Sequence, residues 1–335
     1  MPPARQARWI IMKSALITGI HGFVGTHMCR RLLKQGYRVS GFDRGTVGSD
    51  RLAAIIDDKA AFDGVQLHTC DLADISEIKK LLERIDCDHV FHLAGTAFVP
   101  DAWADPAGAF TNNTLNTIHL LQAMKDLNWR GRFLYVSSSD VYGQPAPEAM
   151  PINETSVPDP KNPYAASKLA AEQFALCLNA GLKDMEIIIA RPFNHIGPAQ
   201  RPSFVVPEFL TAMEEAKASG ATHIRVGDIN SARDFTDVRD VTQAYQILLE
   251  RGQSGEIYNV CSGKPTTIQE IFERAREVVG ASVEYKVDEG KLRPEGSDVR
   301  YGQADKLRAL GCEPQFTLAD SIRDAHEFMN RVVPA

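Results

Sequence analysis

The chain has 335 residues, of which 44% are hydrophobic and 24% charged, a composition typical of soluble globular proteins. Its formal net charge of -6, without a long basic run, argues against nucleic acid or an anionic membrane surface as a partner. No stretch of about 18 apolar residues occurs, so no membrane-spanning helix is predicted. This length suits two lobes, or one large α/β domain with a smaller cap.

The six cysteines are scattered along the chain and include no CxxC pair. We therefore expect neither a disulfide framework nor a zinc site, and no other metal is predicted. Residues 1–11 are basic, without the long apolar core of a secretory signal, and we expect a disordered leader or an upstream start there. Thiols without a disulfide framework and the absence of an export signal together favour the cytoplasm.

A glycine-rich turn follows the first predicted strand. The apolar run at residues 14–18 leads into Gly19-x-x-Gly22-x-x-Gly25, then a helical pattern, then a second strand at residues 38–42. Strand, glycine turn, helix and strand are the context of a dinucleotide-binding fingerprint. The glycines permit the tight turn and let backbone N–H groups approach a pyrophosphate at the helix N-terminus.

An acidic residue, Asp43, closes the second predicted strand. Its carboxylate would accept hydrogen bonds from ribose hydroxyls and repel a 2′-phosphate, which favours NAD(H) as the cofactor. Arg44 follows immediately and weakens the preference for NAD(H), so NADP(H) stays open as the alternative.

Strands and helices then alternate along the chain. Further strands are predicted at residues 65–70, 89–95, 132–136 and 185–190, and helices at residues 75–85 and 107–127. This rhythm predicts an α/β fold with a Rossmann-type, doubly wound parallel sheet. Ligands of such sheets lie beyond the carboxyl ends of the strands. Residues at those predicted ends are Gly19, Asp43, Asp71, Ala94 and Ser138.

The pattern is less regular after residue 190. Helices are predicted near residues 206–218, 238–250, 268–279 and 318–328, with short strands around 224–227 and 233–237. We interpret residues 12–190 as mainly a nicotinamide-binding domain. Residues 191–330 are interpreted as mainly a smaller α/β lobe for the substrate, interleaved with late strands of the sheet.

Tyr164 and Lys168 are four residues apart in a predicted helix that begins near Pro163. Residues at this spacing share one helix face, so the phenol and the ammonium are expected to lie together. A nearby cation favours the phenolate, and we expect it to lower the pKa of Tyr164 from its usual value of about 10. Such a tyrosine can exchange a proton with an oxygen whose carbon gains or loses hydride.

With these motifs the sequence resembles the extended short-chain dehydrogenases/reductases of the NAD-dependent epimerase/dehydratase branch. The resemblance covers residues 12 to about 330. It is carried by the glycine turn, by residues 92–95 (HLAG), by residues 137–143 (SSSDVYG) and by the Tyr164-x-x-x-Lys168 pair. Residues 191–198, 233–240, 258–263 and 292–294 resemble the GDP-sugar members of the branch.

The resemblance implies roles for individual residues. Tyr164 would be the acid/base, with Lys168 as its partner and Ser138 bonded to the reacting sugar oxygen. The implied cofactor-binding residues are Gly19, Gly22, Phe23, Val24, Gly25, Asp43, Arg44, Asp71, Leu72, Leu93, Ala94, Gly95, Asn113, Tyr164, Lys168 and Pro192. The implied substrate-binding residues are Thr96, Ser138, Asn194, Val226, Arg233 and Arg293. Arginine side chains at these last positions suit the diphosphate of a nucleotide sugar.

The resemblance also implies the reaction. The first candidate is NAD(P)H-dependent reduction of the C4 keto group of GDP-4-keto-6-deoxy-D-mannose to GDP-D-rhamnose. The alternatives are GDP-mannose 4,6-dehydration and nucleotide-sugar 4-epimerisation with tightly held NAD. Asp140 separates them, since dehydratases of this group carry a glutamate base where this chain has the shorter aspartate. Relatives commonly dimerise through a four-helix bundle, so a homodimer is expected.

Overall fold

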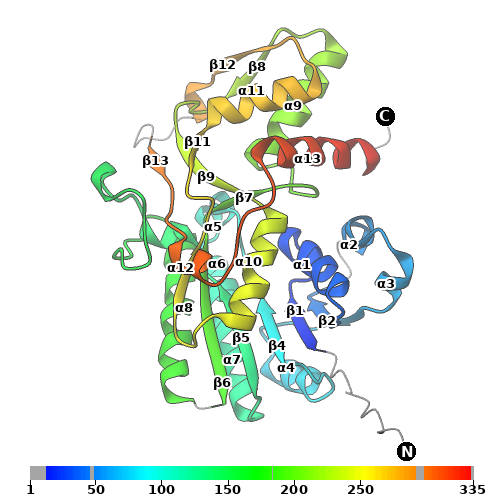
Figure 1. The fold of residues 1–335 in the computed structure, drawn as a ribbon, viewed down its shortest axis with the longest axis vertical. Helices are drawn as coiled ribbons and strands as arrows, with labels where there is room; N and C mark the ends of the chain where they lie inside the picture. Colours follow the sequence, from blue (N-terminus) through cyan, green and yellow to red (C-terminus); the bar gives the residue numbers. More distant parts are fainter. Residues whose placement is uncertain (1–12, 46–48, 183, 292–297, 333–335) are drawn as a thin grey trace, which may run out of the picture.

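The protein is built around a seven-stranded sheet in which all neighbouring strands are parallel (Figure 1). The computed structural model describes residues 13–45, 49–182, 184–291 and 298–332. The strand order is β10-β6-β5-β4-β1-β2-β3. The strands are β1 (Ser14–Thr18), β2 (Arg38–Asp43), β3 (Gln66–Thr69), β4 (His89–His92), β5 (Gly131–Val136), β6 (Met185–Pro192) and β10 (Ile257–Val260). The predicted doubly wound fold is confirmed, and its order reverses between β1 and β4, where such sheets bind ligands.

Alternate residues of the central strands pack on opposite faces of this sheet. Leu16 and Phe133 belong to one buried cluster, whereas their chain neighbours Ile17 and Leu134 belong to another. Side chains of a strand alternate between faces, so a sheet covered on both sides needs uninterrupted apolar strands. This requirement explains the apolar runs in the sequence.

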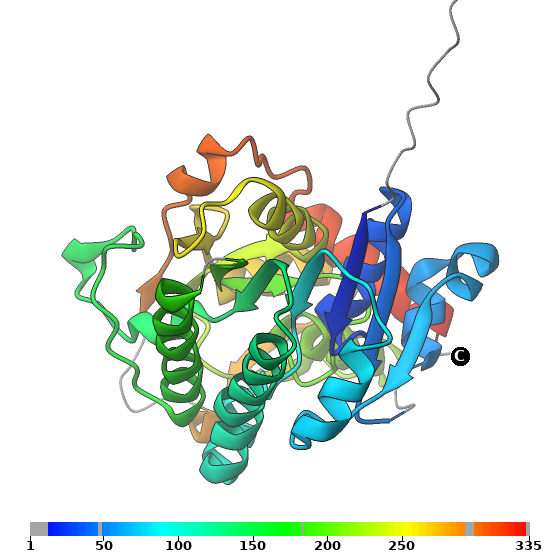
Figure 2. The same cartoon turned by 90° about the horizontal axis from the view of Figure 1, so that it is seen from below.

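Two groups of helices cover the sheet. The helices are α1 (Phe23–Lys34), α2 (Ser49–Ile56), α3 (Lys59–Asp63), α4 (Ile75–Leu82), α5 (Val99–Ala104), α6 (Pro106–Phe110), α7 (Asn116–Asp126), α8 (Pro163–Gly181) and α10 (Val238–Arg251). Helices α1 and α10 contribute to the cluster that contains Ile17, and α7 and α8 to the cluster that contains Leu16. Figure 2 shows α7 and α8 side by side against the sheet.

The single helix predicted at residues 107–127 is instead three pieces. A π-helical turn, Thr111–Leu115, joins α6 to α7. Such a turn adds a residue to the helix and changes which side chains share a face, so the 3.6-residue pattern does not reveal it. The helices α2 and α3, between β2 and β3, were not predicted.

The smaller lobe contains short strands and three α-helices within the described residues. They are β7 (Asn194–Ile196), α9 (Val205–Ser219), β8 (His223–Val226), β9 (Ala232–Asp237), β11 (Pro265–Thr267), α11 (Ile268–Val279), β12 (Glu284–Val287), β13 (Val299–Arg300) and α13 (Leu318–Val332). A third apolar cluster lies here, in which the rings of Phe209 and Phe272 pack edge to face. Helix α12 (Asp305–Ala309) packs on the main sheet beside β10. Between β9 and β11 the chain returns to the main sheet as α10 and β10. The predicted boundary at residue 190 lies within β6 and stays a prediction.

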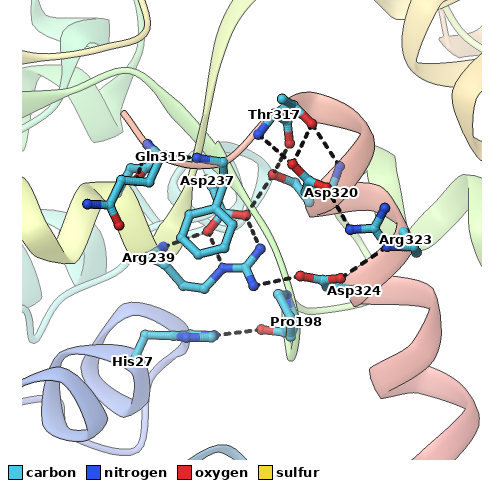
Figure 3. Close-up of polar contacts among 12 residues, drawn as sticks. His27, Pro198, Asp237, Arg239, Gln315, Thr317, Asp320, Arg323 and Asp324 are labelled. Carbon is cyan, nitrogen blue, oxygen red and sulfur yellow. Dashed lines mark hydrogen bonds and ion pairs between the residues drawn. The ribbon is translucent and has the colours of Figure 1, made fainter. Parts of the chain in front are cut away.

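A polar network joins α10 to the C-terminal helix α13 (Figure 3). Arg239 donates to both carboxylate oxygens of Asp237, at 2.8 and 2.7 Å, and to Asp324 at 2.6 Å. Ser321 of α13 donates to Asp237 at 2.7 Å. Nearby, the Nε2 atom of His27 donates to the carbonyl of Pro198 at 2.9 Å. These contacts connect helices of the main sheet to the smaller lobe.

Within the described ranges, no helix combines the length and apolarity needed to cross a membrane. The same residues contain no group of three or more His, Cys, Asp or Glu side chains arranged to hold a metal ion. All six cysteines are free thiols, and only Cys177 is exposed.

Candidate active site

The glycine turn after β1 leaves no room for side chains. Gly19 has a φ of +71°, and a Cβ atom there would lie 3.0 Å from the backbone of Ala94. A Cβ on Gly25 would lie 2.2 Å from the carbonyl oxygen of Gly19. Helix α1 begins directly after Gly22, so its first N–H groups point out of the turn. Phe23, Val24 and Gly25 form the first turn of this helix, and the arrangement fits a dinucleotide pyrophosphate.

Asp43 lies at the carboxyl end of β2, beside this turn. Its Oδ1 accepts the N–H of Arg44 at 3.0 Å, and its Oδ2 is 3.8 Å from Nδ1 of His21. The carboxylate is about one-third exposed, so it can still accept hydrogen bonds from a ligand. The position fits the predicted contact with a ribose.

A cleft opens at these strand ends. Eight predicted cofactor residues and Thr96 line it, namely Gly19, Gly22, Asp43, Arg44, Leu72, Leu93, Ala94, Gly95 and Thr96. Four further lining residues, Phe42, Cys70, Asn112 and Asn116, were missed by the sequence analysis. Phe42 and Cys70 precede residues flagged at strand ends, so their position was available in the sequence, whereas Asn112 and Asn116 depend on the helix that contains the π-turn. Asp71, next to Cys70, is exposed and accepts the N–H of Ala73.

Buried polar residues fix the shape of the cleft wall. The Oγ1 atom of Thr18 accepts the N–H groups of Leu93 and Ala94 at 3.1 Å each, so its own proton must go to Nδ1 of His92, 2.8 Å away. His92 is held neutral, because burial lowers its pKa to about 3 and the charge of Lys168 acts in the same direction. The loop after β4 is therefore held to β1 by hydrogen bonds to the Thr18 hydroxyl.

Asn113 anchors the next part of this loop. Its Oδ1 accepts the N–H of Thr96 at 2.8 Å, and its Nδ2 donates to the carbonyl of Thr96 and to the hydroxyl of Ser167. The structure thus places Asn113 between the cleft loop and helix α8. Its predicted direct contact with the cofactor stays a prediction.

Tyr164 and Lys168 occupy the first turns of α8. Asn162 caps this helix by accepting the N–H of Ala165 at 2.8 Å, and Pro163 is its first residue. Lys168 is buried, with its Nζ atom 5.0 Å from the centre of the Tyr135 ring. The ammonium also approaches Gly95 in the cleft wall, since a Cβ atom built on that glycine would lie 4.0 Å from Nζ.

The pKa values of Tyr164 and Lys168 shift in opposite directions. Burial raises the pKa of Tyr164 well above its usual value, the negative charge of Asp140 adds to this, and a hydrogen bond with Ser138 opposes it. The expectation of a pKa lowered by Lys168 is therefore wrong for the protein alone, because desolvation of the phenolate dominates. Burial lowers the pKa of Lys168 to about 8, and the carboxylate of Glu172, one turn further on, opposes the shift.

Ser138 and Asp140 belong to the loop after β5. The hydroxyl oxygen of Ser138 accepts the N–H of Asp140 at 3.1 Å, which leaves the hydroxyl proton available to Tyr164 or to a substrate. The carboxylate of Asp140 is 3.6 Å from the guanidinium of Arg300, on β13. Sequence reasoning missed Arg300, since only the fold brings it to this loop.

The structure separates the predicted substrate residues. Asn194 is exposed at the start of β7, and Pro192 ends β6 just before it. Arg233 is anchored on β9, where it forms an ion pair with Asp298 and donates to the carbonyl of Asp298 at 2.8 Å. Val226 is buried in the core of the smaller lobe, so its side chain does not join the others. Arg293 lies outside the described residues.

Comparison with known proteins places the chain in a family. A family model described as GDP-mannose 4,6 dehydratase matches residues 16–325. The chain belongs to this family. The family model and the solved relatives cover nearly the whole chain, and the resemblance inferred from the motifs is confirmed.

Relatives of this dehydratase family include reductases and epimerases. GDP-6-deoxy-D-mannose reductase of Pseudomonas aeruginosa is 42% identical over 259 residues, which cover 76% of this chain and 84% of the relative. A structure of RMD from the same organism, complexed with NADPH, has a TM-score of 0.80 and 34% identity and covers 96% of this chain and 100% of its own. UDP-glucose 4-epimerase of Thermus thermophilus with NAD has a TM-score of 0.82 and 28% identity, with 96% and 100% covered.

Proposed function

We propose that the protein is an NAD(P)H-dependent reductase that converts the C4 keto group of GDP-4-keto-6-deoxy-D-mannose to the alcohol of GDP-D-rhamnose. The observation that carries this proposal is the similarity to GDP-6-deoxy-D-mannose reductase, at 42% identity over 76% of the chain. The proposal is supported by Ser138 on the loop after β5, which is hydrogen-bonded to Tyr164 at the start of α8, and by Lys168 one turn further along that helix.

The residues divide the chemistry in a simple way. A reduced nicotinamide, when bound, supplies hydride to C4. Tyr164 gives its phenolic proton to the C4 oxygen, and Ser138 donates a hydrogen bond to the same oxygen. Lys168, one helical turn further along α8, supplies the positive charge that would stabilise the phenolate remaining on Tyr164.

Dehydration is the alternative, and the family model carries its name. A 4,6-dehydratase needs a base that removes the C5 proton, and Asp140 stands in the position expected for that base. Here its carboxylate is already paired with Arg300, which argues against such a role. A reductase needs no second base.

Cofactor preference follows from the end of β2. Asp43 favours NAD(H) through its negative charge, whereas the neighbouring Arg44 leaves NADP(H) usable. Values of kcat/KM for NADH and NADPH, measured with the same keto sugar, test this preference.

The reaction itself is tested by supplying GDP-mannose or GDP-4-keto-6-deoxy-D-mannose, each with NADH or NADPH. We expect net oxidation of the nicotinamide only with the keto sugar, and GDP-D-rhamnose as the product. Conversion of GDP-mannose without added cofactor would show a dehydratase or epimerase instead.

A homodimer in the cytoplasm completes the proposal. Phe110 and Leu115 expose 45% and 40% of their surfaces beside α7 and α8, where a second copy can cover them in a four-helix bundle. Sedimentation of the Leu115→Glu variant tests this interface, since a buried charge should produce monomers. The free thiols of the chain fit the reducing conditions of the cytoplasm.

A further inference from the structure

Four charged side chains form a continuous row from the loop after β5 to the smaller lobe, namely Asp140, Arg300, Asp298 and Arg233. Arg300 lies at its centre, with one guanidinium nitrogen 3.6 Å from Asp140 and its Nε 3.0 Å from Asp298. Asp298 in turn pairs with Arg233. The side chains of Arg300 and Asp140 are only 17% and 24% exposed, so water screens their pairing less than that of a surface pair.

The position of Arg300 is set by the smaller lobe. Strand β13, which carries it, pairs with β9 of that lobe, where Arg300 lies opposite Arg233. The same guanidinium donates to the carbonyl of Gly143 at 3.3 Å, so it contacts both Asp140 and the end of the loop that begins at Ser138. Arg300 thus connects the proposed diphosphate side to the loop that carries Ser138 and Asp140.

Several titratable groups lie around Tyr164. They are Asp140 on the loop after β5, Tyr135 on β5, Tyr245 on α10 and Lys168 on α8. Among them, Asp140 is the charged group that raises the pKa of Tyr164, and its carboxylate is the one that Arg300 pairs with. Asp140 therefore links Arg300 to the phenol.

We propose that Arg300 is a positioning residue for proton transfer. By holding the Asp140 carboxylate in an ion pair, it limits the repulsion between that carboxylate and the phenolate that Tyr164 becomes when its proton moves to the C4 oxygen. The inference rests on the proposed reductase function. In this view Asp140 is not a base, and its negative charge is balanced by Arg300. Because β13 of the smaller lobe carries Arg300, that lobe takes part in the proton transfer.

The test compares Arg300→Gln, Asp140→Asn and the double variant in the reduction of GDP-4-keto-6-deoxy-D-mannose. In Arg300→Gln the uncompensated carboxylate makes Tyr164 a weaker acid, and we expect kcat to fall about threefold to tenfold. The alkaline limb of the pH–rate profile should move to higher pH, because loss of the Arg300 positive charge raises the pKa of both Tyr164 and Lys168. Asp140→Asn alone should move that limb to lower pH.

The double variant separates an electrostatic effect from a structural one. Removing the Asp140 charge in the Arg300→Gln background should restore kcat, and Arg300→Lys should retain most of it. Arg274→Gln, an exposed arginine of the same lobe, is the matched control and should leave the profile unchanged. Circular dichroism checks that each variant folds.

Two results would overturn the inference: a double variant as slow as Arg300→Gln, or an Asp140→Asn profile identical to that of the wild type. Failure of the proposed function has a different appearance, namely a wild type that converts GDP-mannose and not the keto sugar. The same variants then report on that reaction, in which Tyr164 first accepts a proton. There the acidic limb should move to higher pH in Arg300→Gln, and an unmoved limb would overturn the role of Arg300.

Discussion

Lys168 holds its proton weakly. Burial disfavours the ammonium and lowers its pKa to about 8, although Glu172 opposes the shift. The cation is therefore present below this pH and is lost as the pH rises through it. Since the phenolate of Tyr164 needs that charge, we expect kcat/KM for reduction to fall above pH of about 8. A pH–rate profile of kcat/KM, which reports on the free enzyme, checks this prediction.

The Lys168→Arg variant is the control for this assignment. A guanidinium keeps its proton far above the pKa of an ammonium, so the decline near pH 8 should vanish even if the overall rate is lower. A decline that stays in place in this variant would assign the titration to another group.

At the level of elements, helix α8 is fastened to the sheet by a buried ion pair. Arg191 of β6 donates through Nε to Glu172 of α8 at 3.0 Å, and the two side chains are 2% and 0% exposed. The guanidinium also lies 4.7 Å from the centre of the Tyr142 ring. Glu172 is on the helix turn that follows Lys168, so this contact fixes the helix that carries the catalytic pair.

Replacing Glu172 by glutamine leaves the Arg191 charge buried without its partner. We expect the free energy of unfolding to fall by about 3–5 kcal/mol, as measured by urea denaturation. In Glu172→Gln/Arg191→Met both charges are gone, and much of this loss should be recovered, because apolar replacements of buried pairs are often tolerated. If the losses in unfolding free energy of Glu172→Gln and of Arg191→Met simply added up in the double variant, the two side chains would not be coupled.

The sequence predicts the alternation of strands and helices because the apolar strands and glycine turn are local patterns. It also predicts which strand ends carry site residues, since parallel order places them at one edge. It does not predict that Arg191 pairs with Glu172 or Arg300 with Asp140, because those partners meet only through tertiary packing. The predicted direction of the Tyr164 pKa shift was wrong for the same reason. The sequence reveals Lys168 four residues away, whereas the burial of Tyr164 and its closeness to Asp140 depend on the fold.

At the scale of the whole molecule, residues 233–240 serve mainly to join the two lobes. Asp234 accepts the N–H groups of Ser262, Gly263 and Gly302, and Asp240 those of Gln315 and Phe316. The buried Asp237 accepts hydrogen bonds from Arg239 (Figure 3) and from the hydroxyl of Ser321. The acidic residues of this stretch thus accept bonds from backbone, hydroxyl and arginine groups, and Arg233 is the end of the row of charges that reaches Asp140.

Asp237→Ala should therefore loosen the smaller lobe. It removes the cap of α10, the acceptor of Ser321 and the main partner of Arg239, whose guanidinium packs 3.6 Å from the centre of the Phe316 ring. We expect a loss of roughly 3 kcal/mol in the free energy of unfolding and faster hydrogen exchange at the amides of α13. Asp320→Ala, on the exposed side of the same helix, should cost far less. If α13 exchanged at the same rate in both variants, Asp237 would be only a local helix cap, and α13 would have to be held by the apolar packing around Phe209 and Ile322 within the smaller lobe.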